Sequence, residues 1–347
     1  MDAKFSLTQA QCLNSLEEFY KLLSISRNSV IELLSKPDKL NYNSFAIPKK
    51  RIGHRLIQSP VLKLKLLQKK MNAFLQSLYY EINDGLNCHG FIANKSIKTN
   101  ALPHINKNFV LNLDLKNFFQ SIAYKKIVKV LSEDPFLLNP EISILIAQIC
   151  CYNNFLAQGS PTSPILSNIV CINLDKQLTD LSDVRNLIYS RYADDLTFSS
   201  NCSDINYMRE SLLQITKVIK NEGFIVNEDK TRILQKTRSQ VVTGLVVNNK
   251  LSVRRGYLRN IRAILHSFKN SSSGGDAREK YLASTLHYKR DKEVSIEHSI
   301  RSKIEYIGFI MGKNNRHYLR LQEQFKQIFA EDQHHKLKDS FQIDFDW

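Results

Sequence analysis

The sequence lacks the features that mark zinc-binding, disulfide-bonded and membrane-spanning proteins. Its six cysteines form no CxxC pair and have no histidine at the spacing of a zinc site, so we expect reduced and mostly buried thiols. The most apolar stretch, residues 142–151, is too short and too interrupted to cross a bilayer, and no signal peptide is visible. These absences predict a cytoplasmic protein that has no membrane partner.

Acidic residues are also scarce. The chain has 33 Asp and Glu against 49 Lys and Arg, which gives a formal net charge of +16. Residues 49–70 hold eight basic and no acidic side chains, residues 250–320 hold sixteen basic and six acidic ones, and residues 331–347 reverse the sign with two against five. This balance favours a polyanionic partner, nucleic acid rather than a membrane, although one basic block alone is equally typical of a solvated surface.

Hydrophobic patterning predicts a large folded chain. The chain has 347 residues, of which 43% are hydrophobic, so it can bury a substantial core in two or three subdomains. The sequence contains no internal repeat. Helical spacing predicts helices over residues 6–34 (two), 61–82, 123–132, 141–151, 165–181, 204–222 and from 254 onward. Alternation predicts two strands within 45–60 and further strands over 109–115, 187–191, 196–199, 224–226 and 241–247. The order predicts an α+β fold with an antiparallel sheet.

Two adjacent carboxylates, Asp194 and Asp195, stand at the predicted turn of a β-hairpin. Like charges at one tip need a compensating cation, which is either a divalent metal or a Lys or Arg side chain. Asp114 leaves the strand over 109–115 on the face opposite its apolar residues. Alone it is as compatible with an N-cap or an edge position as with a metal ligand.

Three further segments have the composition of binding sites, and each also has a simpler interpretation. The basic turn within 45–60 can clamp a triphosphate or be an ordinary surface hairpin. The loop over 158–164, forced by one Gly and two Pro, can position a substrate through its amides or be merely a turn. The basic helices after residue 254 fit the backbone of a duplex.

Phosphoryl transfer to a growing strand needs carboxylates, a triphosphate clamp and a basic arm together. The chain in fact resembles a reverse transcriptase and, within that class, a bacterial retron reverse transcriptase. Residues 192–195 resemble the family's YADD box, and Asp114 with the two phenylalanines that follow resembles its first palm motif. Residues 158–164 are similar to its QGxPTSP segment, except that Ala157 replaces the usual Pro.

Two shorter matches separate retron enzymes from intron and retroviral ones: NAxxH over 100–104 and VTG over 242–244. The resemblance extends from about residue 45 to 249. It implies a right-hand polymerase fold, with fingers and palm built on an antiparallel sheet and a basic α-helical thumb. The implied domains are an N-terminal helical region (1–44), fingers and palm (45–248), a basic thumb (249–330) and an acidic tail (331–347), with no room for a nuclease or protease domain.

The resemblance also implies a two-metal centre. Asp114 and Asp194 would bridge two Mg²⁺ ions. The carbonyl of Leu115 would add a ligand, and Asp195 would support the site electrostatically. Lys230 would protonate or neutralise the pyrophosphate.

The implied substrate is a deoxynucleoside triphosphate (dNTP). Lys50 and Arg55 would hold its triphosphate, and Gln158 would lie beside its sugar and base. Phe119 would exclude a ribose 2′-OH, the atom that separates the two kinds of nucleotide, although a core phenylalanine is the simpler interpretation.

The implied partner is a cognate structured non-coding RNA that serves as template and primer. DNA would start from an internal guanosine 2′-OH and give a branched RNA–DNA hybrid, multicopy single-stranded DNA (msDNA). A separate effector protein and a role in phage defence are further expectations. The rivals are an intron-type or diversity-generating reverse transcriptase and a catalytically inert RNA-binding module. The residues expected to hold RNA are Asn100, His104, Val242, Thr243, Gly244, Arg255, Arg259 and Arg262.

Overall fold

The computed structural model describes residues 5–49, 53–82, 87–270, 279, 281 and 296–339, with only the backbone described over 330–339. The chain divides into two compact units, residues 1–243 and 244–347. Lys50 in the basic turn and the predicted loop over 271–275 lie outside the described residues. Within the described ranges, no helix is both long and apolar enough to cross a membrane.

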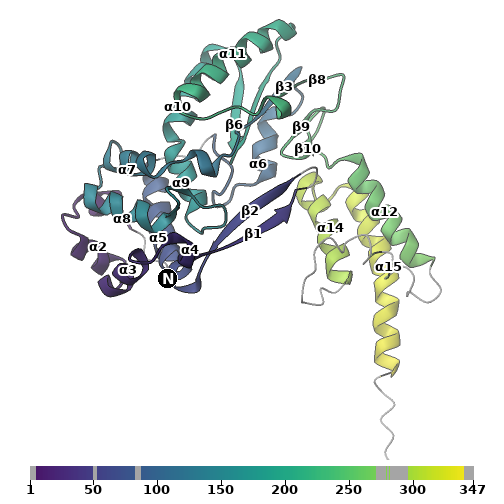
Figure 1. The fold of residues 1–347 in the computed structure, drawn as a ribbon. Helices are drawn as coiled ribbons and strands as arrows, with labels where there is room; N and C mark the ends of the chain where they lie inside the picture. The colour runs from purple at the N-terminus through teal and green to yellow at the C-terminus, as the bar shows by residue number, and fades with distance from the viewer. Residues whose placement is uncertain are drawn as a thin grey trace, which may run out of the picture. The chain divides into compact units, whose positions relative to one another are not determined.

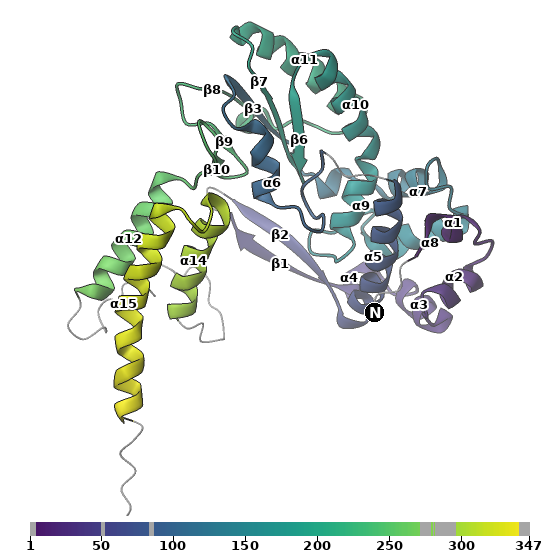
Figure 2. The same ribbon diagram turned by 180° about the vertical axis from the view of Figure 1, so that it is seen from behind.

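The first unit mixes helices and short strands (Figures 1 and 2). Its helices are α1 (Leu7–Gln11), α2 (Leu16–Leu22), α3 (Arg27–Leu34), α4 (Asp38–Asn41), α5 (Leu62–Ile82), α6 (Ile97–Ala101), α7 (Tyr124–Ser132), α8 (Pro140–Cys150), α9 (Ser163–Val170), α10 (Ile172–Val184) and α11 (Ile205–Asn221). Short 3₁₀ turns are η1 (Leu102–His104), η2 (Phe119–Ser121) and η3 (Glu228–Lys230). Its strands are β1 (Tyr42–Pro48), β2 (His54–Pro60), β3 (Phe109–Asp114), β4 (Cys151–Tyr152), β5 (Phe155–Leu156), β6 (Ile188–Tyr192), β7 (Asp195–Ser200), β8 (Arg232–Gln235) and β9 (Val241–Val242).

A four-stranded antiparallel sheet of order β6-β7-β3-β8 carries the site, as the alternation in its strands predicts. Helices cover both faces. Tyr189 and Arg191 of β6 hydrogen-bond to Asp175 of α10, whereas Ser190 between them hydrogen-bonds to His104 of η1. Because successive strand residues point to opposite faces, α10 and η1 lie on opposite sides of the sheet.

The core of this unit is the sheet face toward α10 and α11. Leu111, Leu113, Leu196 and Phe198 are each no more than 2% exposed, and the predicted strand alternation puts all four on that face. Full burial of such a side chain stabilises the fold by about 1.5–3 kcal/mol relative to leaving it in water. The polar partners in the same strands are thereby directed to the other face, where the carboxylates lie.

Helices differ from the prediction in four places. Residues 6–34 form three helices rather than two, and the short helix α4 was not predicted. The predicted helix over 165–181 is divided at Cys171 into α9 and α10. Residues 97–104, for which no helix is predicted, form α6 and η1, because Ser96 and Thr99 make a reciprocal capping box that starts the helix.

Strands also differ from the prediction, which lacks the short pair β4–β5. The predicted strand over 241–247 is interrupted, because Thr243 and Gly244 have φ of 44° and 86° and no extended strand accommodates such values. Residues 224–226 contribute only an isolated bridge from Val226 to Leu115. Strand β8 was not predicted, since its charged and polar ends hide the short apolar centre.

The second unit contains β10 (Leu245–Val246) and the helices α12 (Arg255–Lys269), α14 (Ile296–Met311) and α15 (Arg316–Asp339). Leu258, Ile261 and Leu265 form the buried stripe of α12. The arginines of α12 lie on its exposed side, as the sequence predicts: Arg255, Arg259 and Arg262.

Candidate active site

The three carboxylates named from the sequence meet at one end of the central sheet. Asp114, the last residue of β3, pairs directly with Asp195, the first residue of β7. Asp195 also pairs with Tyr192 across the hairpin, so Asp194 lies in the two-residue turn between them. The backbone N–H of Leu115 donates to the carbonyl of Asp194 at 3.0 Å, which fixes that turn against the end of β3.

Negative charge is concentrated here. Burial raises the pKa of Asp194, and the neighbouring Asp114 carboxylate raises it further. Loss of surrounding water, then repulsion from Asp194 and Asp114, raises the pKa of Asp195 to about 7, although its side chain is open on one side to solvent. Carboxylates in this condition are stabilised by an added cation.

The donor set is entirely oxygen, which suits a hard divalent cation such as Mg²⁺. Within the described residues, however, no three Asp, Glu, His or Cys side chains are arranged as a ready-made metal site. Asp114 instead accepts from two groups, Lys230 Nζ on Oδ2 at 2.8 Å and Asn227 Nδ2 on Oδ1 at 3.0 Å. Lys230 is therefore placed beside the carboxylates, as a counter-ion of Asp114.

The basic hairpin and the Gly-Pro loop are joined to each other. Gln58 of β2 donates its N–H to the carbonyl of Gln158 at 2.9 Å, and its side-chain oxygen accepts from the N–H of Gln158 at 3.2 Å. A Cβ on Gly159 would lie 2.7 Å from the carbonyl oxygen of Gln58, so only glycine permits this approach. Arg55, on the same strand, lies near enough to Asp194 to oppose the burial that raises its pKa.

The two adjacent phenylalanines after Asp114 differ in burial. Phe118 is 4% exposed and packs against Phe224, with ring centroids 5.8 Å apart. Phe119 is only partly buried, and its ring lies 5.4 Å from that of Phe118. One ring thus belongs to the core, and the other is available to line a site.

Arg191, which sequence reasoning did not single out, is fully buried directly behind the turn. Its guanidinium makes two bonds to Asp175, at 2.8 and 2.6 Å, and donates to Asn168 Oδ1 at 3.1 Å. It also donates to the carbonyl of Ala193 at 3.3 Å. Ala193 has φ of 57°, which a residue with a Cβ adopts only at a cost, so Arg191 helps to hold the strained turn.

The NAxxH side chains lie in the interior. His104 is fully buried between Ser199 Oγ at 2.7 Å and Ser190 Oγ at 2.8 Å, and burial lowers its pKa to about 3, which keeps the imidazole neutral. Asn100 is also fully buried, and its amide has no hydrogen-bond partner in the described part of the chain. Both side chains are enclosed by protein in this structure. The expected role of Asn100 and His104 in RNA binding stays a prediction.

Two residues of the VTG segment are likewise held by contacts within the protein. Val242 is fully buried, and the hydroxyl of Thr243 donates to the carbonyl of Ile97 in α6 at 3.2 Å. The VTG segment is therefore attached to α6, the helix that contains Asn100. Gly244 begins the second unit, which also carries the exposed arginines of α12.

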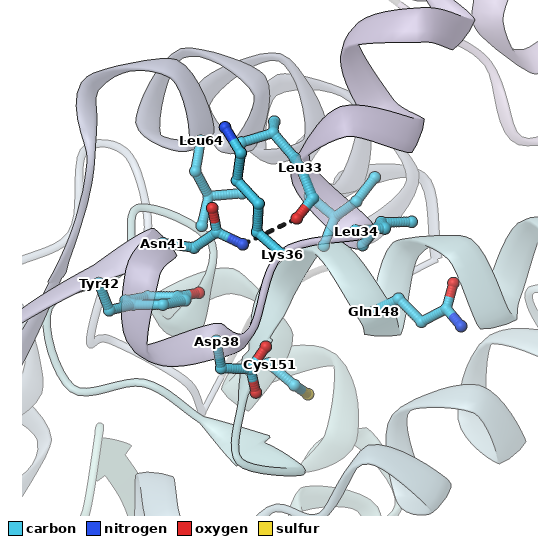
Figure 3. A pocket seen from close by; sticks show the side chains of 10 residues that line it. Leu33, Leu34, Lys36, Asp38, Asn41, Tyr42, Leu64, Gln148 and Cys151 are labelled. Atoms are coloured by element: carbon cyan, nitrogen blue, oxygen red, sulfur yellow. Dashed lines mark hydrogen bonds between the residues drawn. The ribbon is translucent and has the colours of Figure 1, made fainter.

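A cavity elsewhere in the unit contains none of these groups. It lies between α3, α4, α5 and α8, and Asn41, Tyr42 and Gln148 are among its lining residues (Figure 3). The Asn41 amide donates to the carbonyl of Leu33 across it. We assign it no part in the site.

Comparison with known proteins identifies the family. The reverse transcriptase (RNA-dependent DNA polymerase) family matches residues 47–311. The retron Ec86 reverse transcriptase of Escherichia coli is 35% identical over 258 residues, which cover 73% of this chain and 78% of that protein. The chain belongs to the retron reverse transcriptases.

This chain spans only part of a second retron relative. The retron Mx65 reverse transcriptase of Myxococcus xanthus is 33% identical over 264 residues, 72% of this chain but only 60% of that protein. Among solved structures, telomerase from Candida albicans is similar at a TM-score of 0.46 and 14% identity, over 91% of this chain and 68% of that chain. The family match confirms the predicted α+β, right-hand polymerase fold of this retron reverse transcriptase.

Proposed function

We propose that the protein is an RNA-directed DNA polymerase, which extends a DNA strand from dNTPs on an RNA template. The observation that carries this proposal is the cross-strand pairing of Asp114 with Asp195, beside Asp194, in a chain of the reverse transcriptase family. Carboxylates grouped in this way hold the cations that phosphoryl transfer requires. Chemistry at this site is addition of a nucleotide to a terminal hydroxyl, with pyrophosphate as the leaving group.

Two Mg²⁺ ions are the proposed cofactor. Asp114 and Asp194 would hold them, with the Leu115 carbonyl as an added ligand and Asp195 in support. The all-oxygen donor set and the raised pKa of the hairpin carboxylates support this assignment. Bound metal would activate the attacking hydroxyl and stabilise the leaving group.

The nucleotide would lie between the hairpin β1–β2 and the carboxylates. Arg55 would pair with the triphosphate, together with Lys50 of the basic turn, and Gln158 would lie beside the sugar and base. The bonds between Gln158 and β2 support a shared binding surface. Phe119 would exclude a ribose 2′-OH, and Lys230, whose side chain is 60% exposed, would neutralise or protonate pyrophosphate.

The template would be a cognate structured RNA, primed from an internal guanosine 2′-OH to give branched msDNA in the bacterial cytoplasm. Membership in the retron family supports this proposal. The exposed arginines of α12 would contact the duplex backbone, in a thumb over 249–330, and the palm and fingers would occupy 45–248. A separate effector protein and a role in phage defence complete the proposal.

Primer extension on an RNA template in Mg²⁺ tests the polymerase. Asp194→Asn should lower kcat by more than about 100-fold, because even groups that only orient a metal ligand contribute about 10- to 100-fold. Asp180→Asn, an exposed acid on α10, is the matched control and should extend normally. Equal extension by wild type and Asp194→Asn would refute the two-metal centre. If the wild-type protein binds RNA but extends no primer, the protein is an inert RNA-binding module.

The priming chemistry needs its own experiment. Protein isolated from its native host should carry an RNA joined to DNA through a 2′–5′ link. Debranching enzyme should separate the two strands, and sequencing should identify one RNA. A linear product that is insensitive to debranching would point to an intron-type or diversity-generating enzyme instead.

A further inference from the structure

A short segment, residues 87–91, adds to the free edge of β6. The N–H of Arg191 donates to the carbonyl of Asn87 at 2.7 Å, and the N–H of His89 donates to the carbonyl of Arg191 at 2.8 Å. Cys88 and Arg191 form the corresponding parallel bridge. The segment is therefore held by the strand that ends in the carboxylate turn.

Gly90 fixes the segment against the turn itself. A Cβ at this position would lie 2.5 Å from the backbone nitrogen of Ala193 and 3.1 Å from the carbonyl carbon of Tyr192. The carbonyl of Gly90 also accepts from Asn168 Nδ2 at 3.0 Å. Backbone packing this close leaves little freedom between Gly90 and Asp194, the neighbour of Ala193.

Phe91 follows in an unusual conformation. Its φ is 63°, in the left-handed region that bulky residues rarely adopt, and its side chain is 41% exposed. Strained backbone persists only where the surroundings impose it, and such positions cluster at functional sites. Phe91 directly follows Gly90, which is packed against the carboxylate turn.

The ring of Phe91 lies against that of Phe119. Their centroids are 6.4 Å apart and the rings are tilted by 42°, within the range of favourable aromatic pairs. Phe119 also contacts the buried Phe118 at 5.4 Å. Phe119 is thus held between one ring from the core and one ring from the segment attached to the carboxylate turn.

We propose that Phe91 is a positioning residue for sugar selection, which holds the Phe119 ring in place against the nucleotide sugar. The proposal rests on the proposed function, in which Phe119 excludes a ribose 2′-OH. Segment 87–91 is attached to both β6 and the Ala193 turn. Through Phe91, the position of the Phe119 ring therefore depends on the position of the carboxylate turn. Without Phe91, the Phe119 ring loses its outer aromatic neighbour and can yield to a 2′-OH.

Single-nucleotide incorporation with matched deoxy- and ribonucleotides tests the proposal, as the ratio of the two kcat/KM values. Phe91→Ala should raise relative ribonucleotide use by about 10-fold, less than the roughly 10²-fold effect that a 1 Å misplacement can produce. The change should appear in the ribonucleotide KM, with deoxynucleotide kcat retained. Phe91→Tyr keeps a ring and should keep wild-type selectivity. Phe309→Ala removes a phenylalanine of similar exposure, 48%, from α14 of the second unit and should leave the ratio unchanged.

The double variant separates positioning from direct contact. If Phe91 acts through Phe119, Phe91→Ala adds nothing to the selectivity loss of Phe119→Ala. Independent, additive effects would overturn the proposal. Unchanged selectivity in Phe91→Ala, with altered selectivity in Phe119→Ala, would also overturn it and leave the proposed function standing. Unchanged selectivity in both variants would remove Phe119 from sugar selection as well, while primer extension itself would still support the polymerase.

Discussion

At the scale of single residues, a buried ion pair supports the carboxylate turn from behind. Among the described residues, Arg191 is the largest side chain by volume that is fully buried. Its partner Asp175 is 7% exposed. Removing two charges from water costs several kcal/mol, and such a pair is tolerated only where further hydrogen bonds satisfy both groups. Here Tyr189 donates to Asp175, while Asn168 and Ala193 accept from Arg191. The pair therefore specifies the geometry of the turn more than it adds net stability.

Asp175→Asn should lower the free energy of unfolding by about 3–5 kcal/mol, because it leaves the Arg191 guanidinium buried without a counter-charge. Urea unfolding measures the change. Glu17→Gln is the control, since its pairing with Arg27 at 3.4 Å leaves both side chains 66% exposed. An exposed pair contributes at most about 1 kcal/mol. Equal losses in the two variants would mean that Asp175 does not compensate Arg191.

At the scale of elements, the sequence was sufficient for the strands that bear the carboxylates. Alternation in β3 and β7 predicts their faces, because one side of each strand is fully buried, whereas β6 is predicted as a strand without an assignment of its faces. Arg191 was missed because a single arginine in a strand is usually an exposed edge residue, and its partner Asp175 is sixteen residues away on a helix. A pattern in the local sequence cannot reveal an ion pair that forms only through tertiary packing.

The signature segments show the same limit. Residues 97–104 are polar in composition, yet Asn100 and His104 are fully buried. His104 hydrogen-bonds to two serine hydroxyls on adjacent strands, and nothing in the sequence indicates that Ser190 and Ser199 meet one imidazole on the same face of the sheet. Composition indicates polarity, whereas burial depends on which polar groups meet.

His104→Ala should therefore act on stability. It leaves two buried hydroxyls without their partner and opens a cavity, which together should cost about 2–4 kcal/mol. The urea midpoint measures this loss. His54→Ala, at an exposed position of β2, is the control and should change stability by less than about 0.5 kcal/mol. Normal stability with weakened RNA binding would restore His104 to direct RNA contact.

The contact between β2 and the loop over 158–164 gives a second prediction at this scale. Gly159→Ala should raise the KM for dNTP, because the new Cβ would force the loop away from the carbonyl oxygen of Gln58, 2.7 Å distant. Steady-state primer extension at varied dNTP measures the change.

Gly223→Ala is the matched control for Gly159→Ala. Gly223 also has positive φ, 77°, but open space where its Cβ would lie. It should lose about 1 kcal/mol of stability without a change in KM. Equal KM values in both variants would mean that the loop does not contribute to nucleotide binding.

At the scale of the whole molecule, the charge distribution is the feature that sequence predicts best, because net charge does not depend on the fold. Two blocks carry most of the basic surplus: residues 49–70, with eight basic and no acidic side chains, and residues 250–320, with sixteen basic and six acidic ones. In α12 the buried stripe directs the arginines to the opposite, exposed side. Such cations bind phosphates without reading sequence, and each contact releases counterions.

Binding of an RNA–DNA duplex should therefore weaken steeply with salt, and the arginines of α12 should account for part of the slope. Replacing Arg255, Arg259 and Arg262 together with Gln should reduce the slope of log K against log salt by about 3, one for each phosphate contact. Fluorescence anisotropy across a salt series measures it. Arg209→Gln, an exposed arginine of α11 outside both basic blocks, should leave the slope unchanged. An unchanged slope in the triple variant would mean that this face of α12 does not contact the duplex, and the basic hairpin would then have to supply the electrostatic attraction.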